Sequence, residues 1–284
     1  MKNIFYCLVI GSLLSGTAYG QKKLLKEAPG VVSYSYRNDL AKDVPGTLDK
    51  IKSVGITNIE FSGLFGQTPE QLRALLDARG MRCTSIGVGY GDLDKHMDKV
   101  IAQAKALGAE FVRIGSIPHP GNFQDLHADV VKQAAIDFNK FGKTLAENGL
   151  TFCYHNHGPE FKPAGELGDG MLFDYLVQNT DPKYVSFEMD VMWVYWPGQD
   201  PIYWLNKYPN RFKLMHVKNV KKGLERGKGA TFVSVGEGQM DMEAILRAAQ
   251  KTKIKYFYIE DESAPEFIDA QMPVSVQFLE GLKK

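Results

Sequence analysis

The stretch ITNIEFSG, residues 56–63, followed closely by TPEQLRALLDARG, residues 68–80, contains one complete strand–helix unit. Its first part is a short run of β-type residues that ends in glycine, as a strand before a turn does. In its second part Thr68 is a good N-cap, Pro69 occupies the first helical position, and Gly80 ends the helix. The pattern therefore predicts one β-strand that leads into one α-helix.

The same alternation repeats along the chain from residue 30. Strands are predicted in GVVSYSYR (30–37), ITNIEFSG (56–63), MRCTSIGVGY (81–90), AEFVRIGSIP (109–118), LTFCYHNH (150–157), YVSFEMDVMWV (184–194), FKLMHVKN (212–219) and IKYFYIEDE (254–262). A helical segment follows each of them, for example DLDKHMDKVIAQAKALG (92–108). Eight such units predict an α/β fold, a closed (β/α)8 TIM barrel, as a single domain over residues 21–284. A doubly wound open sheet is the alternative, but no Gly-rich dinucleotide turn follows the first strand.

The N-terminus is typical of an export signal. Lys2 precedes the apolar run IFYCLVIGSLL (4–14), and the small-residue sequence AYG (18–20) precedes Gln21. The apolar run has about half of the ~20 residues that a membrane span needs. We therefore expect residues 1–20 to be a signal peptide, the protein to be periplasmic or secreted, and the mature chain to lack a membrane span.

The composition argues against a nucleic-acid partner. The 284-residue chain has a formal net charge of +1, whereas a nucleic-acid groove needs a marked surplus of Lys and Arg. A repair endonuclease on the same barrel would need this basic surface, and also more His and carboxylate ligands than a chain with 6 histidines offers.

The two-residue period of strands separates two sets of side chains. In YVSFEMDVM the apolar residues at 185, 187, 189 and 191 alternate with Ser186, Glu188 and Asp190. The apolar set suits contact with the outer helices, which leaves the polar set facing the barrel interior. By the same pattern other strands direct ionisable groups inward, namely Glu60, Arg113, His155, His157, His216, Lys218, Glu260 and Glu262. Since buried charges need partners or a metal, and barrel active sites form at the carboxyl ends of the strands, this set predicts a functional site.

Four ordered motifs carry a resemblance to a known family. They are FEMDVMWV (187–194), LMHVKN (214–219), VGEGQMDMEAIL (235–246) and YIEDE (258–262), each at a strand end. In this order they resemble the sugar phosphate isomerase/epimerase superfamily, the xylose isomerase-like TIM barrels. The resemblance covers essentially the whole mature chain. It implies one divalent metal ion, held by Glu, Asp, His and Glu from the fifth to the eighth strands.

The resemblance places three ligands directly. Asp190, His216 and Glu260 match the last three positions of the family set. At the first position the stretch CYHNHGPEF (153–161) has His155, with His157 beside it, which resembles the His-x-His strand end of inosose dehydratase-like members. The resemblance thus implies His155 as the fourth ligand, although the choice between the two histidines stays open. Mixed imidazole and carboxylate ligands suit Mn, Co, Zn or Fe more than Ca.

This site predicts proton abstraction next to the carbonyl of a sugar or keto-sugar. A divalent ion at the carbonyl and a neighbouring hydroxyl would make the adjacent C–H acidic and stabilise an enediolate. With Glu260 as the base, isomerisation or epimerisation would follow. Because a histidine titrates near neutrality, His157 could instead protonate a departing hydroxyl. A lyase or dehydratase that performs β-elimination is therefore the alternative.

Other residues are expected to contact the substrate or to support the site. Lys218 could bind a substrate oxygen or polarise the carbonyl, and Glu188 could orient ligands or pair with Lys218. Trp193 could stack on a sugar ring or simply pack. Together with Glu160, a predicted contact to sugar hydroxyls, the substrate-facing set is Glu160, Glu188, Trp193, Glu60 and Arg113.

A non-catalytic sugar-binding protein is the competing hypothesis from another class. Such a protein would not need Asp190, His216 and Glu260 all intact, so the sequence favours an enzyme. Because phosphorylated sugars are mainly intracellular, an exported enzyme is expected to act on a neutral sugar, a keto-sugar or an oxidised glycoside.

Overall fold

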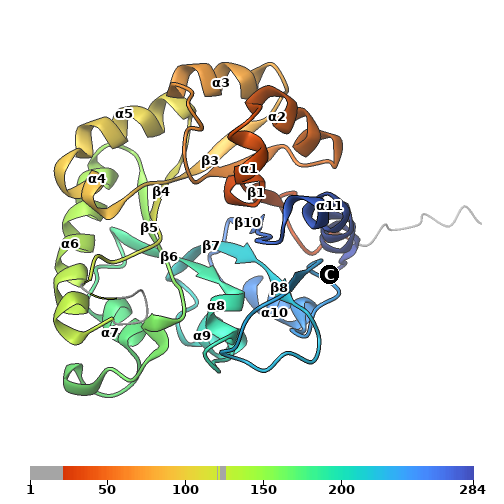
Figure 1. Ribbon diagram of the computed structural model, residues 1–284. Coiled ribbons are helices and arrows are strands. Elements are labelled where there is room, and N and C mark those ends of the chain that lie inside the picture. Colours follow the sequence, from red (N-terminus) through yellow and green to blue (C-terminus); the bar gives the residue numbers. More distant parts are fainter. Residues whose placement is uncertain (1–21, 120, 122–125) are drawn as a thin grey trace, which may run out of the picture.

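The predicted barrel is present in the computed structural model, which describes residues 22–119, 121 and 126–284. Eight parallel strands close in the order β1-β10-β7-β6-β5-β4-β3-β2, and helices surround them (Figure 1). The strands are β1 Gly30–Val32, β2 Asn58–Phe61, β3 Arg82–Gly87, β4 Phe111–Ile114, β5 Thr151–His155, β6 Val185–Asp190, β7 Phe212–Val217 and β10 Tyr256–Ile259. The predicted fold class is confirmed, while the predicted signal peptide lies outside the described residues.

The helices follow the strands as the repeated units predict. They are α1 Arg37–Leu40, α2 Val44–Ser53, α3 Pro69–Asp77, α4 Tyr90–Lys95, α5 Met97–Leu107, α6 Ala128–Glu147, α7 Leu172–Gln178, α8 Val191–Tyr195, α9 Pro201–Lys207, α10 Met242–Ala249 and α11 Pro265–Gly281. At α3 the Thr68 side chain accepts from the Gln71 N–H, and Gln71 accepts from the Thr68 N–H, a capping box that fixes the start of the helix. Across the described residues, none of the helices has the length and apolarity to cross a bilayer.

Several predicted elements differ in their bounds, and three of the differences have a local structural cause. The first strand is shorter than GVVSYSYR, because a 3-10 helix covers Ser33–Tyr36. The segment 92–108 contains the end of α4 and all of α5, which are separated at His96. The predicted strand 184–194 stops at Asp190, since the Asp190 side chain accepts from the N–H groups of Met192 and Trp193 and so begins α8.

The loop between β7 and α10 contains a feature that the sequence pattern did not indicate. Here β8 Asn219–Val220 pairs antiparallel with β9 Phe232–Val233. This small hairpin begins two residues after β7 ends, and so lies near the carboxyl ends of the barrel strands.

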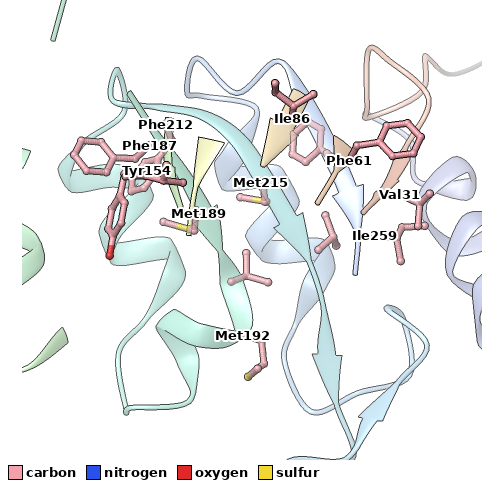
Figure 2. Packing of buried hydrophobic residues seen from close by; sticks show 14 of the residues in the cluster. Val31, Phe61, Ile86, Tyr154, Phe187, Met189, Met192, Phe212, Met215 and Ile259 are labelled. Atoms are coloured by element: carbon pink, nitrogen blue, oxygen red, sulfur yellow. The ribbon is translucent and has the colours of Figure 1, made fainter. Parts of the chain in front are cut away.

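Alternate residues of each strand fill two separate apolar layers. The outward residues pack between the barrel and its helices, as Figure 2 shows for Phe187, Met189, Met215 and Ile259. The inward apolar residues form a smaller cluster, Val32, Phe111, Cys153, Leu214, Tyr256 and Tyr258. Fully burying a large apolar side chain contributes about 1.5–3 kcal/mol. The outward layer therefore fixes which face of each strand points into the barrel.

Neighbouring strands are aligned so that polar residues lie at one level. His155 is opposite Glu188, Asp190 is opposite His216, and His216 is opposite Tyr258. This register brings the carboxyl ends of β5, β6, β7 and β10 together.

Candidate metal centre and active site

Ionisable side chains from the strand ends surround a cavity of about 210 Å³. The cavity is lined by Tyr34, Ser62, Arg113, His155, His157, Trp193, His216, Glu260 and Glu262. Six of these were predicted as site residues from the sequence. The barrel thus gathers side chains from β4 to β10 that are up to about half the chain apart.

Two histidines are each backed by a buried carboxylate. His155 Nδ1 lies 3.1 Å from Glu188 Oε2, and His216 Nε2 lies 2.8 Å from Glu60 Oε1. Both carboxylates are completely buried. In metal sites a ligating histidine commonly donates its second ring N–H to a carboxylate, which fixes the orientation of the ring. His155 and His216 have this arrangement.

Arg113 holds the two supporting carboxylates. Its Nε lies 2.8 Å from Glu60 Oε1 and 3.3 Å from Glu188 Oε2. Burial opposes the ionisation of Glu60, but Arg113 and His216 together lower its pKa to about 2. Burial and the neighbouring charge of Glu60 raise the pKa of Glu188 to about 7. Arg113 therefore keeps at least one buried negative charge behind the histidines.

Three donor side chains converge in front of these carboxylates. Ligand atoms of His155, Asp190 and His216 lie within 4.8 Å of one another. Asp190 Oδ1 accepts from the N–H groups of Met192 and Trp193 at 2.9 and 3.0 Å. Its Oδ2 is buried and lies 3.1 Å from the Lys218 Nζ. A second group, Glu60, Glu188 and His216, is equally close, but Arg113 already lies against both of its carboxylates.

The charges of the site suit a divalent cation. Within the described residues, four buried carboxylates (Glu60, Glu188, Asp190 and Glu260) face two permanent cations, Arg113 and Lys218. When all four are ionised and His216 is neutral, two negative charges remain, and buried negative charge requires compensation. A divalent ion would supply it, so the residues fit a metal ion.

The histidines differ in the charge that their surroundings favour. Burial, followed by the nearby His216 and His157, holds the pKa of His155 well below its usual value. Burial also opposes a charge on His216, but Glu188, Glu260 and Glu60 raise its pKa well above the usual range. His155 is therefore neutral, as a metal ligand must be. The carboxylates that favour a proton on His216 equally favour a metal ion there.

Lys218 is buried among carboxylates. Its Nζ lies 3.1 Å from Asp190 Oδ2 and 2.7 Å from Glu260 Oε2, and it also pairs with Glu262. Burial opposes its charge, but these three carboxylates raise its pKa. The predicted pairing of Lys218 with Glu188 is wrong, because Glu188 lies on the other side of His216 and contacts Arg113.

Glu260, like Glu262, combines pairing with Lys218 and access to the cavity. Burial opposes its ionisation, but Lys218 and His216 hold its pKa well below the usual range. His216 Nδ1 lies 3.2 Å from Glu260 Oε2, the oxygen that Lys218 also contacts. Glu260 is therefore ionised and fixed through one of its oxygens.

His157 lies at the cavity wall beside Trp193. The centroids of the His157 and Trp193 rings are 5.6 Å apart, and the Lys218 Nζ is 5.7 Å from the Trp193 ring centroid. Burial, followed by the charge of Lys218, lowers the pKa of His157 to about 3. The expectation that His157 titrates near neutrality is therefore wrong for the site without substrate, where the ring is neutral.

Three residues that were predicted to contact the substrate instead contact other protein groups and are buried. Glu160 accepts hydrogen bonds from the Tyr154 hydroxyl and, at 3.1 Å, from the His157 N–H, and it borders a different, small pocket. Glu60 and Glu188 are completely buried behind the histidines. Glu160 therefore shapes the end of β5, and the other two orient His155 and His216.

Three cavity residues were missing from the predicted set. Tyr34 lies in the 3-10 helix that replaces the end of the first predicted strand, and Ser62 follows β2. No local pattern marks either of them. Glu262 was on the predicted inner face but was not predicted as a site residue, because its pairing with Lys218 could not be read from the sequence.

The chain is similar to known proteins over this whole region. A model of the family described as xylose isomerase-like TIM barrel matches residues 48–281. The inosose dehydratase of Geobacillus thermodenitrificans (strain NG80-2) is 28% identical, but the match spans only 45% of each chain. The inosose dehydratase of Lacticaseibacillus casei is 23% identical over 83% of this chain and 90% of the relative.

A solved structure has the same architecture. It is described as a sugar phosphate isomerase/epimerase from Parabacteroides distasonis ATCC 8503 and is 25% identical, with a TM-score of 0.70. The superposition covers 94% of this chain and 96% of that chain.

Proposed function

The chain belongs to the xylose isomerase-like TIM barrel family, and on that premise we propose that it is a metal-dependent lyase. The reaction would be β-elimination, most simply the loss of water, from a keto-sugar or a keto-cyclitol. The observation that carries this proposal is the convergence of His155, Asp190 and His216 beside the ionised Glu260, at a cavity that His155, His216 and Glu260 line. The inosose dehydratases among the relatives support elimination over isomerisation.

We assign the metal ion to His155, Asp190 and His216. Glu188 and Glu60 would fix the two rings through their second nitrogens. When bound, a divalent ion supplies positive charge beside the substrate carbonyl and so makes the neighbouring C–H more acidic. Mn, Co, Zn and Fe are the metals that suit these donors.

Glu260 is assigned as the base rather than as a fourth ligand. It lies outside the group of close ligand atoms, it lines the cavity, and it is ionised. A carboxylate placed next to the substrate can accept the proton from the carbon beside the carbonyl. Lys218 acts through Glu260 as a positioning residue, since it contacts Glu260 and does not line the cavity.

His157 is assigned to the departing oxygen. Because its ring is neutral, it donates a hydrogen bond from its N–H and does not need to release a proton. As the C–H pair of electrons forms the new C=C bond, the C–O bond breaks. Glu260 then passes the proton that it accepted to the departing hydroxide, which leaves as water, and Glu260 returns to its ionised state.

Isomerisation or epimerisation is the second candidate, and the cavity lining argues against it. Epimerisation by two carboxylates requires one base on each face of the substrate. Along the cavity wall formed by described residues, the only carboxylates are Glu260 and Glu262, which come from the same strand end. The remaining titratable groups are Arg113, three histidines and Tyr34.

The reaction class is tested by mass spectrometry of the products. The protein, loaded with Mn, Co or Zn, is incubated with an inosose, with ketohexoses and with 3-keto-glycosides. We expect a product that is lighter by one water or by the departing alcohol, and at least about a 100-fold loss of rate in Glu260→Gln. A product of unchanged mass would reject the lyase and support an epimerase.

We also propose that the protein is exported and that residues 1–20 are removed. The support is the signal-like composition of this segment. N-terminal sequencing of protein purified from its native envelope fraction should begin at Gln21. An intact Met1 in cytoplasmic protein would reject this proposal, and the expectation of a neutral substrate would lose its basis.

A further inference from the structure

The cavity has a larger pocket beside it. This outer pocket has a volume of about 490 Å³, more than twice the 210 Å³ of the cavity, and the two share Ser62 and Arg113. Its other walls come from the segments after β2 and β3 and from α4 and α5, which Figure 1 shows at the outer edge of the barrel. A ligand bound in the cavity would therefore have room to continue past Arg113.

One face of α5 supplies polar groups to the outer pocket. Lys99 and Gln103 line it four residues apart, which places them on one side of the helix, and His96, immediately before α5, lines it too. Among the described residues, none of the three side chains has an ion pair or a hydrogen-bond partner. Asp92 and Ser62 also line the pocket.

Arg113 also keeps unused donors at the boundary. Its Nε faces Glu60 and Glu188, whereas no hydrogen bond from Nη1 or Nη2 to a described residue is found. A Cβ on Gly87 would lie 2.7 Å from Nη2, and one on Gly115 would lie 3.0 Å from Nη1. Two glycines thus make room for the guanidinium group between the cavity and the outer pocket.

We infer that the outer pocket binds a second sugar ring, so that the substrate is a disaccharide or a similar glycoside with its oxidised ring in the cavity. This inference rests on the proposed function for the identity of the oxidised ring. Hydroxyl groups both donate and accept hydrogen bonds, and the pocket offers donors at Lys99 and Arg113, an acceptor at Asp92, and both at Gln103. An anion such as phosphate would meet the Asp92 carboxylate as well as Lys99 and Arg113, whereas hydroxyl groups can use all of these groups.

Binding measurements test the second subsite without relying on turnover. Glucose, cellobiose, maltose, lactose and sucrose are titrated into the metal-loaded mature protein by calorimetry. At least one disaccharide should bind at least about tenfold more tightly than glucose. Lys99→Ala combined with Gln103→Ala should remove this preference and leave glucose binding unchanged. Lys105→Ala, on the same helix but outside the pocket lining, should keep the preference.

Two results would overturn the inference. One is equal affinity for glucose and for all four disaccharides. The other is displacement of the bound disaccharide by inorganic phosphate at an equal concentration, because the pocket would then be an anion site. The His155→Gln variant separates this inference from the proposed function: a disaccharide preference that survives there without activity would support the subsite, whatever the reaction is.

Discussion

Arg113 is the residue that allows the barrel to place carboxylates behind its histidines. Glu60 and Glu188 come from strands that are far apart in sequence, and Arg113 lies against both. Without a cation in that place, the two carboxylates would repel each other in a buried environment. The site therefore depends on Arg113, which lines the cavity on one side and, on the other, holds the two carboxylates that lie behind the histidines.

Replacing Arg113 with Met should strongly destabilise the protein. Removal of one partner from a buried ion pair costs about 3–5 kcal/mol, because the remaining charge is left uncompensated. Urea unfolding measures the change. As a control, Arg73→Met breaks an exposed pair with Asp77 and should cost about 0–1 kcal/mol. Similar losses in both variants would contradict the role given to Arg113.

The two neighbouring histidines should separate metal binding from turnover. His155→Gln removes a donor of the converging group, so the purified variant should contain almost no metal. His157→Gln should retain the metal content of the wild type while losing about 100-fold or more in rate. Elemental mass spectrometry and a rate assay on the same samples decide. If only His157→Gln lost the metal, His157 would be the ligand and His155 would be the residue at the departing oxygen.

At the scale of elements, Gly142 shows how closely α6 packs against the backbone that precedes β6. A Cβ on Gly142 would lie 2.4 Å from the carbonyl oxygen of Tyr184, immediately before β6. Overpacking of this kind costs about 1–3 kcal/mol, so Gly142→Ala should lower the free energy of unfolding.

The same substitution elsewhere is the matched control for Gly142. At Gly91, in α4, a Cβ would meet nothing within 4 Å, and replacement of a helical glycine by alanine stabilises by about 0.5–1 kcal/mol. Thermal unfolding of both variants should give shifts of opposite sign. A stabilising effect of Gly142→Ala would show that α6 and Tyr184 are farther apart than the structure indicates.

At the scale of the whole molecule, the proposed metal ion would join three strands. His155, Asp190 and His216 belong to β5, β6 and β7, so an ion bound only by the folded state links segments that separate on unfolding. At a free concentration 100 times its Kd, such a ligand stabilises the fold by about 2.7 kcal/mol.

Removal of the metal should therefore lower the Tm. Treatment with a chelator should reduce the Tm by several degrees, and Mn, Co or Zn should restore it. In His155→Gln the chelator should have no effect. An equal response in that variant would mean that the stabilising ion binds elsewhere.

The sequence alone predicted the barrel because each strand–helix unit carries local signals. The Thr68 cap, the Pro69 start and the alternating pattern around Glu188 and Asp190 act over a few residues, and the chain obeys them. The inward set of charged residues followed from the same alternation. The predicted strand 184–194 ends early, at Asp190, because the side chain of Asp190, which belongs to the site, also caps α8.

Only the tertiary structure decided which charged groups meet. Lys218 lies with Asp190, Glu260 and Glu262, while Arg113 takes Glu60 and Glu188. Alternation along a strand determines the face of a side chain but not its neighbour across the barrel. That neighbour depends on strand register and on the closure of the barrel. The neutral state of His157 and the outer pocket beside Arg113 have the same origin, since burial and hollow space arise only when distant segments pack together.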